Sequence, residues 1–188
     1  GDGVTNDGSV TVSGLEPGAS FEYSTDGGVT WIAGTGTGFT LAEGVYTNVQ
    51  VRQTDAAGNV SPAFALGAVT VDATILPPTV ALASDTATPG DGLTSDGTVN
   101  VGGLEPGATW EYSLDGGATW TTGSGTSFEL AEGTYTGVQV RSTDVAGNVS
   151  APAALGPVTV VTSPAGDLTL ELADDTGASG VDGVTSDG

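Results

Sequence analysis

The sequence predicts an all-β fold made of tandem immunoglobulin-like β-sandwich domains, each of about seven strands. Three observations support this prediction. A long motif set recurs at a fixed spacing, which indicates repeated domains. Short runs of alternating apolar and polar residues are separated by turn residues, as is typical of sandwiches. Gly makes up 32 of the 188 residues, and no stretch shows helical periodicity.

The repeat has a period of about 89 residues. Leu15–Ala19 returns as Leu104–Ala108, where 104 − 15 = 89, and Trp31 returns as Trp120, where 120 − 31 = 89. This period is too long for a solenoid turn, but it is long enough for a small autonomous domain. The predicted domains are 1–74, which lacks its first strand; 75–163, which is complete; and 164–188, which supplies the first strand and acidic loop of a further repeat.

The middle repeat shows each expected strand. The aromatic residues on these strands are expected to pack in the core, the alternative being an exposed platform for sugars. The aromatic set is Trp110, Tyr112, Trp120 and Tyr135. The expected strands are 79–84, 98–101, 109–113, a strand at Trp120, a strand marked by Phe128 and Leu130, one marked by Tyr135, Val138 and Val140, and one marked by Val158 and Val160.

The charge balance excludes several functions. There are 23 acidic and 2 basic residues, a net charge of −21, and neither Cys nor His. Nucleic acid and anionic membranes are excluded as partners because both need clustered basic residues, and no run is long enough for membrane insertion. Without Lys, His or Cys as base or nucleophile, we predict that the chain is not an enzyme. A carboxylate pair for glycoside cleavage is the alternative, but these acids recur at turns in every repeat.

The basic residues Arg52 and Arg141 occupy the same repeat position. In so acidic a chain, each is expected to pair with a carboxylate or to stack on an aromatic ring. The glutamates on strands, Glu22, Glu111 and Glu129, are expected to form a solvated acidic surface.

The acidic residues are concentrated in the loop 85–97, which contains Asp85, Asp91 and Asp96. Two carboxylates about 4 Å apart repel by about 4 kcal/mol at an effective dielectric constant near 20, and no Lys supplies a counter-charge. Calcium binds carboxylate and carbonyl oxygens, whereas zinc prefers the Cys and His that this chain lacks. The loop is therefore a candidate calcium site, and ordinary Asp-Gly turn chemistry is the alternative.

A second candidate lies at the domain junction. The turns 55–59 and 144–148 each begin with Asp and end with Asn, residues that cap turns by bonding to local N–H groups. Asp72 in the first linker could share an ion with Asp144 of such a turn. The second linker has Val161 at the position of Asp72, so the two junctions need not be equivalent.

The segment 168–173 repeats the first-strand pattern of the middle domain. An uncovered sandwich edge favours unwanted pairing. We therefore expect this segment to pair as the missing strand of a neighbouring repeat or of another chain, or to begin a further module.

The motifs in 103–113, 115–120 and 140–148 closely resemble the bacterial Ig-like repeats of giant biofilm-associated and RTX-type adhesins. The resemblance implies an extracellular extender region at the bacterial cell surface, rigidified by calcium, with ligand binding assigned to other domains. The alternatives are a filament subunit that donates a strand through residues 167–175 and a carbohydrate-binding adhesive module. The candidate calcium ligands are Asp2, Asp7, Asp72, Asp85, Asp91, Asp96, Asp144, Asp175, Asp182 and Asp187.

Overall fold

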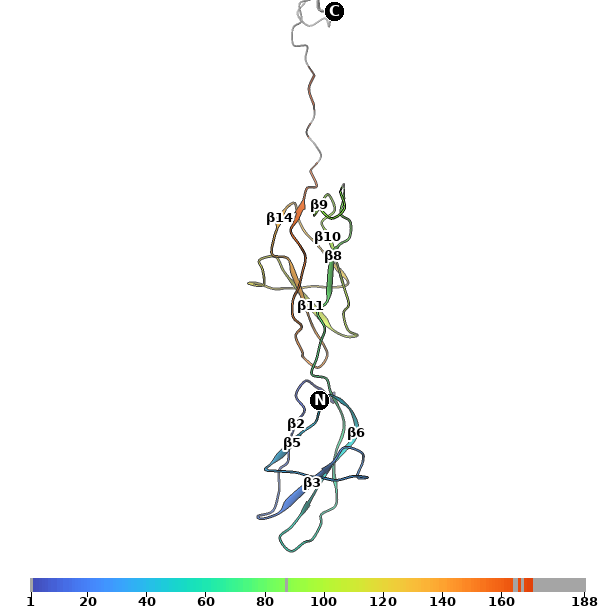
Figure 1. Ribbon diagram of the computed structural model, residues 1–188, viewed down its shortest axis with the longest axis vertical. Helices are drawn as coiled ribbons and strands as arrows, with labels where there is room; N and C mark the ends of the chain where they lie inside the picture. The colour runs from blue at the N-terminus through green and yellow to red at the C-terminus, as the bar shows by residue number, and fades with distance from the viewer. Residues whose placement is uncertain (1, 87, 164–165, 167, 171–188) are drawn as a thin grey trace, which may run out of the picture.

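The computed structural model describes residues 2–86, 88–163, 166 and 168–170. Two β-sandwich modules lie end to end, joined by a linker between strands β7 and β8 (Figure 1). The described residues contain strands, turns and no helix, so none of them forms a helix that could cross a membrane. The predicted all-β, immunoglobulin-like fold is confirmed. The predicted third repeat, 164–188, lies outside the described residues except for four positions.

The second module has strands in two layers. One layer is the sheet β13-β10-β8, and the other is formed by β12-β11-β15-β16 and β14-β17-β9. The strands are β8 (Thr79–Leu82), β9 (Leu93–Thr94), β10 (Thr98–Gly102), β11 (Thr109–Ser113), β12 (Thr121–Thr122), β13 (Ser127–Glu129), β14 (Gly133–Tyr135), β15 (Gln139–Thr143), β16 (Ala153–Ala154) and β17 (Val158–Val160).

The core of the second module is apolar and closed. Trp110 on β11 and Val140 on β15 are buried between the layers, as alternation along each strand requires. The Tyr135 hydroxyl donates to the carbonyl of Ala131 at 3.0 Å, a bond like that of the tyrosine corner in immunoglobulin folds. The expected core packing of the aromatic residues is therefore confirmed for Trp110, Tyr112 and Tyr135.

The acidic loop 85–97 is more ordered than expected. It contains β9, which pairs in parallel with Thr159 and Val160 of β17. The buried hydroxyl of Thr94 donates to the carbonyls of Ser84 and Asp96 at 2.8 and 3.1 Å. The first strand is thus divided between the two layers, with β8 on one and β9 on the other. Because β9 is only two residues long, the sequence shows no alternation of apolar and polar residues that would predict it.

The first module repeats this topology without a counterpart of β8 among the described residues. Its strands form the sheets β1-β7-β6-β3-β4 and β2-β5. Strand β1 pairs in parallel with β7, as β9 pairs with β17, so the module retains the second part of its divided first strand. The strands are β1 (Val4–Thr5), β2 (Ser9–Thr11), β3 (Ser20–Ser24), β4 (Ile32–Ala33), β5 (Gly38–Thr40), β6 (Gly44–Thr54) and β7 (Phe64–Val71).

Beyond the second module, the described residues Leu168–Leu170 form no strand. The side chains of Leu168 and Leu170 are 96% and 98% exposed. These three residues therefore do not pair with a neighbouring repeat of the same chain, which was one of the expected outcomes. Pairing with another chain stays a prediction.

Candidate metal site at the module junction

The turn that follows β15 presents a fixed carboxylate. The Asp144 N–H donates to the Asn148 carbonyl at 3.1 Å, and the Asn148 N–H donates back to Asp144 Oδ1 at 2.8 Å. Gly147 adopts a φ of 91°, which an L side chain rarely allows. The Asp-x-x-Gly-Asn pattern therefore closes the turn locally and fixes the orientation of Asp144.

This turn also holds the linker. Asn148 Nδ2 donates to the Asp72 carbonyl and to Asp144 Oδ2, both at 2.7 Å. On the other side, the Asp72 N–H donates to the carbonyl of Thr5 at 2.9 Å, so Asp72 is tied to both modules. The first linker acid is thus placed beside the turn of the second module, as the sequence suggested it could be.

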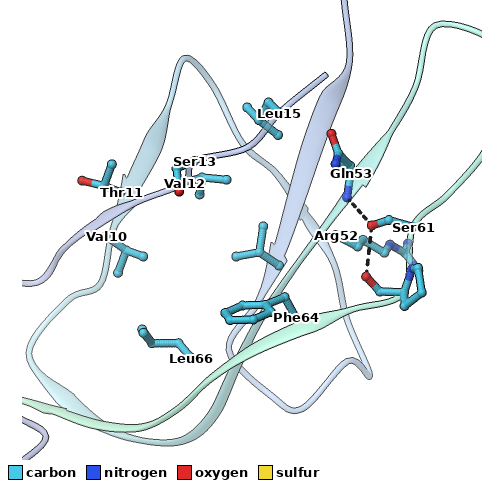
Figure 2. Close-up of a pocket in the computed structure, with 12 residues that line it drawn as sticks. Val10, Thr11, Val12, Ser13, Leu15, Arg52, Gln53, Ser61, Phe64 and Leu66 are labelled. Carbon is cyan, nitrogen blue, oxygen red and sulfur yellow. Dashed lines mark hydrogen bonds between the residues drawn. The ribbon is translucent and has the colours of Figure 1, made fainter. Parts of the chain in front are cut away.

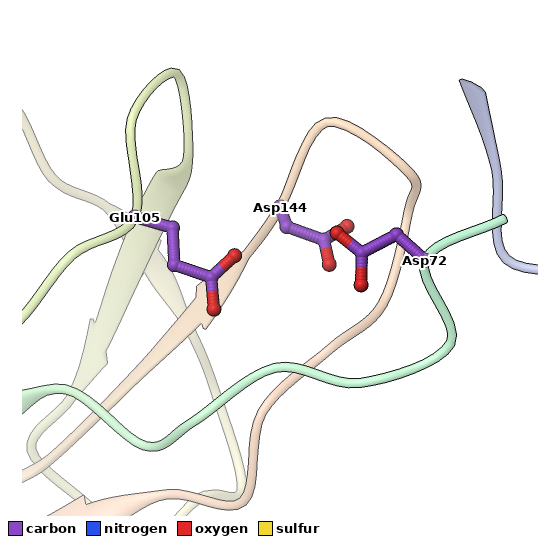
Figure 3. A group of neighbouring side chains, drawn as sticks. All are labelled: Asp72, Glu105 and Asp144. Carbon is purple, nitrogen blue, oxygen red and sulfur yellow. The ribbon is translucent and has the colours of Figure 1, made fainter. Parts of the chain in front are cut away.

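Three carboxylates converge at this junction. Asp72, Glu105 and Asp144 point toward one another (Figure 3), and one oxygen from each lies within 4.8 Å of the others. Glu105 belongs to the turn before β11, which is closed by the Ala108 N–H donating to the Glu105 carbonyl at 3.0 Å. The linker, the turn before β11 and the turn after β15 each contribute one carboxylate.

Within the described residues, neither arginine forms an ion pair with the cluster, since each pairs with a glutamate elsewhere. Asp144 is only 7% exposed, and this burial raises the pKa of its carboxyl. Hydrogen bonds from the Asn148 side chain and from backbone N–H groups of the turn outweigh burial, and the resulting pKa of Asp144 is lowered. Asp144 is therefore ionised at neutral pH. Two carboxylates 4.8 Å apart repel by about 3 kcal/mol at an effective dielectric constant near 20.

The donor set fits calcium. Calcium accepts oxygen ligands at about 2.3–2.6 Å, so two ligands on opposite sides of the ion lie up to about 5 Å apart. The 4.8 Å span of the three carboxylates lies within this limit. The site offers no thiolate or imidazole, which disfavours zinc. Three carboxylates leave further coordination positions for carbonyl oxygens and water, which calcium accepts readily.

The acids of the loop 85–97 are arranged differently. Each caps a local turn: Asp85 accepts from Gly90, Asp91 from Leu93, and Asp96 from Thr98. In the part of the chain that the structure describes, only the junction brings three carboxylates together. The loop geometry thus follows the turn-chemistry alternative, although Asp85 Oδ1 is buried without a hydrogen-bond partner.

The remaining candidate ligands fall into two groups. Asp2 and Asp7 cap turns in the first module, accepting from the N–H groups of Val4 and Ser9 at 3.1 and 2.9 Å. Calcium binding by these aspartates and by the loop 85–97 stays a prediction. The second group, Asp175, Asp182 and Asp187, lies outside the described residues.

Glu105 is the ligand candidate that the sequence analysis missed. Its Glu-Pro-Gly motif is typical of a turn and does not by itself mark a ligand. In an immunoglobulin-like sandwich, the loop after the second strand and the loop before the last strand lie at the same end. That topology places Glu105 beside Asp144, and it could have identified Glu105 from the predicted strand order.

The first module has the same turn but no linker acid beside it in the described residues. Asp55 and Asn59 correspond to Asp144 and Asn148, and Asn59 Nδ2 donates to Asp55 Oδ2 at 2.7 Å. Hydrogen bonds from Asn59 lower the pKa of Asp55. The turn therefore forms without the linker acid, and the cluster at the junction needs Asp72 in addition to the turn.

The two arginines do not reach the junction. Arg52 donates to Glu22 at 2.8 Å and stacks 4.0 Å above the Trp31 ring, and Arg141 repeats this arrangement with Glu111 and Trp120. The expectation of carboxylate pairing or aromatic stacking is confirmed, because each Arg does both. Glu22 and Glu111, which were expected on a solvated acidic surface, are partly exposed, and each also pairs with the arginine beside it on the neighbouring strand.

Comparison with known proteins adds a distant structural likeness. No family model matches the chain, and no curated protein matches it. The fibronectin(III)-like modules of Clostridium thermocellum CbhA are similar to it with a TM-score of 0.44 and 17% sequence identity, over 84% of this chain and 87% of that chain. The described strands and cores define the class: tandem immunoglobulin-like β-sandwich modules with an acidic cluster at their junction.

Proposed function

We propose that this chain is a non-catalytic structural extender of a secreted bacterial surface adhesin, and that calcium stiffens its module junction. The observation that supports this proposal is the cluster of Asp72, Glu105 and Asp144, which joins a linker to the module that follows it. A single ion in contact with all three carboxylates would fix the linker relative to the second module and remove their mutual repulsion.

Calcium binding and assembly of the junction are thermodynamically linked. An ion that binds the assembled junction and not the separated carboxylates stabilises the assembled form by RT ln(1 + [Ca²⁺]/Kd), about 2.7 kcal/mol at one hundred times Kd. Extracellular modules bind calcium at about 10⁻⁴–10⁻³ M, concentrations at which a site of this kind would be filled outside the cell. We therefore expect a calcium site of modest affinity that is filled outside the cell and stiffens the junction.

A catalytic role is not supported. The chain has no Lys, His or Cys, and the carboxylates of the described loops cap turns through short-range hydrogen bonds. A carbohydrate-binding role is also disfavoured by the aromatic residues. Trp110 is buried, while Trp31 and Trp120 each have a guanidinium group over one face of the ring. A flat, open aromatic platform for a sugar is not formed by these three residues.

Calcium binding by two variants tests the proposal. Isothermal titration of the 188-residue protein with calcium is compared with titration of Asp72→Asn and of Asp55→Asn. Asp72→Asn removes a junction carboxylate and should weaken binding at least tenfold. Asp55→Asn alters the equivalent turn of the first module, which is not part of the three-carboxylate cluster, and should leave the junction affinity unchanged. Equal affinities for the three proteins would contradict the proposal, as would the absence of calcium binding.

A further inference from the structure

The turn that follows β15 has hydrogen bonds that hold its shape without the linker. At its base, the Ser142 N–H donates to the Ser150 hydroxyl oxygen at 3.0 Å, and that hydroxyl donates to the Ala151 carbonyl at 2.9 Å. The same two bonds close the turn 55–59 of the first module at Ser61 (Figure 2). Because both modules close this turn in the same way, the turn is a preformed element against which a linker can bind.

The side-chain amide of Asn148 uses both of its N–H groups at the junction. Its Nδ2 donates to the Asp72 carbonyl oxygen and to Asp144 Oδ2, each at 2.7 Å. Both partners are acceptors only, so turning the amide to present its oxygen would break both bonds. An Asp at position 148 would likewise place a carboxylate against two acceptors. Asn is therefore required here for its two donors and its lack of charge.

The linker is held through the main chain of Asp72. Its carbonyl accepts from Asn148 of the second module, and its N–H donates to the Thr5 carbonyl of the first module at 2.9 Å. One linker residue is thus hydrogen-bonded to both modules. Neither bond involves the Asp72 carboxylate, so neither requires a cation at the cluster.

The linker between this contact and the second module is short and stiff. Strand β8 begins at Thr79, which lies opposite Gly102 of β10, so only residues 73–78 lie between Asp72 and the sheet. The last two of them are prolines, whose φ is fixed. The entropy lost on closing a loop grows with its length, so the bond from Asn148 orders few further residues.

The first module also lies against this turn. A Cβ added at Gly147 would lie 3.6 Å from Nδ2 of Asn6, which follows β1, whereas a Cβ added at Gly58 would meet nothing within 4 Å. Asp144 is buried, while Asp55 at the same repeat position is half-buried. The turn of the second module therefore contacts both the linker and the first module.

We propose that Asn148 is a latch that closes the junction without a metal ion and positions the carboxylates of Asp72 and Asp144 for a cation. Repulsion among the carboxylates opposes the latch, and a bound cation reinforces it. The latch itself is independent of calcium, whereas its positioning role rests on the proposed function. A neutral hydrogen bond shifts an equilibrium about fivefold. Loss of the Asn148 side chain should therefore raise the open fraction of the junction about fivefold.

The first test is made in EGTA, so its result does not depend on calcium. Residual dipolar couplings of the backbone N–H groups measure how closely the two modules share one alignment. Asn148→Ala removes both donors and should make the two alignments diverge. Asn59→Ala removes the matching bond inside the turn of the first module and should change nothing. Asp72→Asn keeps the main-chain carbonyl and should also keep the alignment.

Hydrogen exchange of the β15 amides checks that the second module of each variant is folded. Asn148→Asp keeps the shape of the side chain but loses both donors, so it should also open the junction and repeats the test if the alanine variant unfolds. Couplings in either folded Asn148 variant that match those of the unaltered protein would overturn the latch. An equal divergence in Asn59→Ala or in Asp72→Asn would overturn it as well.

The second test measures the positioning role by isothermal titration with calcium. Asn148→Ala removes no carboxylate, yet it should raise the Kd about fivefold, because the ion must then also close the junction. Asn59→Ala should leave the Kd unchanged. An unchanged Kd in Asn148→Ala would contradict the positioning role. If the unaltered protein binds no calcium, the proposed function and the positioning role both fail, and the couplings in EGTA decide the latch alone.

Discussion

A matched pair of core substitutions tests whether burial of the same repeat position differs between the two modules. Val140 and Val51 occupy the same repeat position, 140 − 51 = 89. Val140 is 0% exposed, whereas Val51 is half-buried. Changing Val to Ala removes the equivalent of two methylene groups, about 1.6 kcal/mol of transfer free energy when the side chain is fully buried. The cavity left in a closed core raises the total to about 2–3 kcal/mol.

The expected losses differ between the modules. Val140→Ala should destabilise the second module by about 2–3 kcal/mol, and Val51→Ala should destabilise the first by about half of that, since its side chain is already in contact with water. Native-state hydrogen exchange reports the two modules separately, through the amides of β15 and of β6. Equal losses at the two positions would contradict the difference in burial between Val140 and Val51.

Two further predictions concern local structure. Asp26 accepts hydrogen bonds from the Thr30 hydroxyl, the Thr30 N–H and the Ser24 hydroxyl, which lower its pKa to about 2. Since folding lowers this pKa from 3.8, the carboxylate favours the folded state above about pH 4 and loses this effect as the pH falls toward 2. Carbon NMR titration should find this value, and Thr30→Val should raise it; a midpoint near 3.8 in the unaltered protein would contradict the hydrogen-bond assignment. A Cβ at Gly123 would lie 2.3 Å from the Trp110 ring, whereas one at Gly156 would meet nothing within 4 Å. Gly123→Ala should therefore destabilise the second module by about 1–3 kcal/mol in urea unfolding and Gly156→Ala by little, and similar losses for both would contradict the packing.

The sequence was sufficient to predict the fold because its signals are local and repeated. Strand β11 was predicted with its observed bounds, 109–113, since Trp110 and Tyr112 alternate with polar residues and Gly marks the following turn. Strand β9 was not predicted, because two residues are too few to show a period. Its existence depends on β17, whose paired residues lie 159 − 93 = 66 positions further along the chain.

The candidate site was predicted only in part for a related reason. Asp72 and Asp144 were associated because both lie near the junction in the predicted strand order. Glu105 was overlooked because its position beside Asp144 depends on how the turns at one end of the sandwich converge. The three aspartates of the loop 85–97 are close in sequence, yet hydrogen bonds to Gly90, Leu93 and Thr98 direct them to separate turns. Closeness in sequence therefore did not determine which carboxylates meet.

Small-angle X-ray scattering at dilute concentration, with calcium and with EGTA, measures whether calcium stiffens the junction. Each protein is measured at several dilutions, so that any effect of concentration is removed from the comparison. We expect a longer maximum dimension and a narrower distribution of shapes with calcium, and no response to calcium in the Asp72→Asn variant. Identical scattering with calcium and with EGTA, or an undiminished response in the Asp72→Asn variant, would contradict the claim that calcium stiffens this junction.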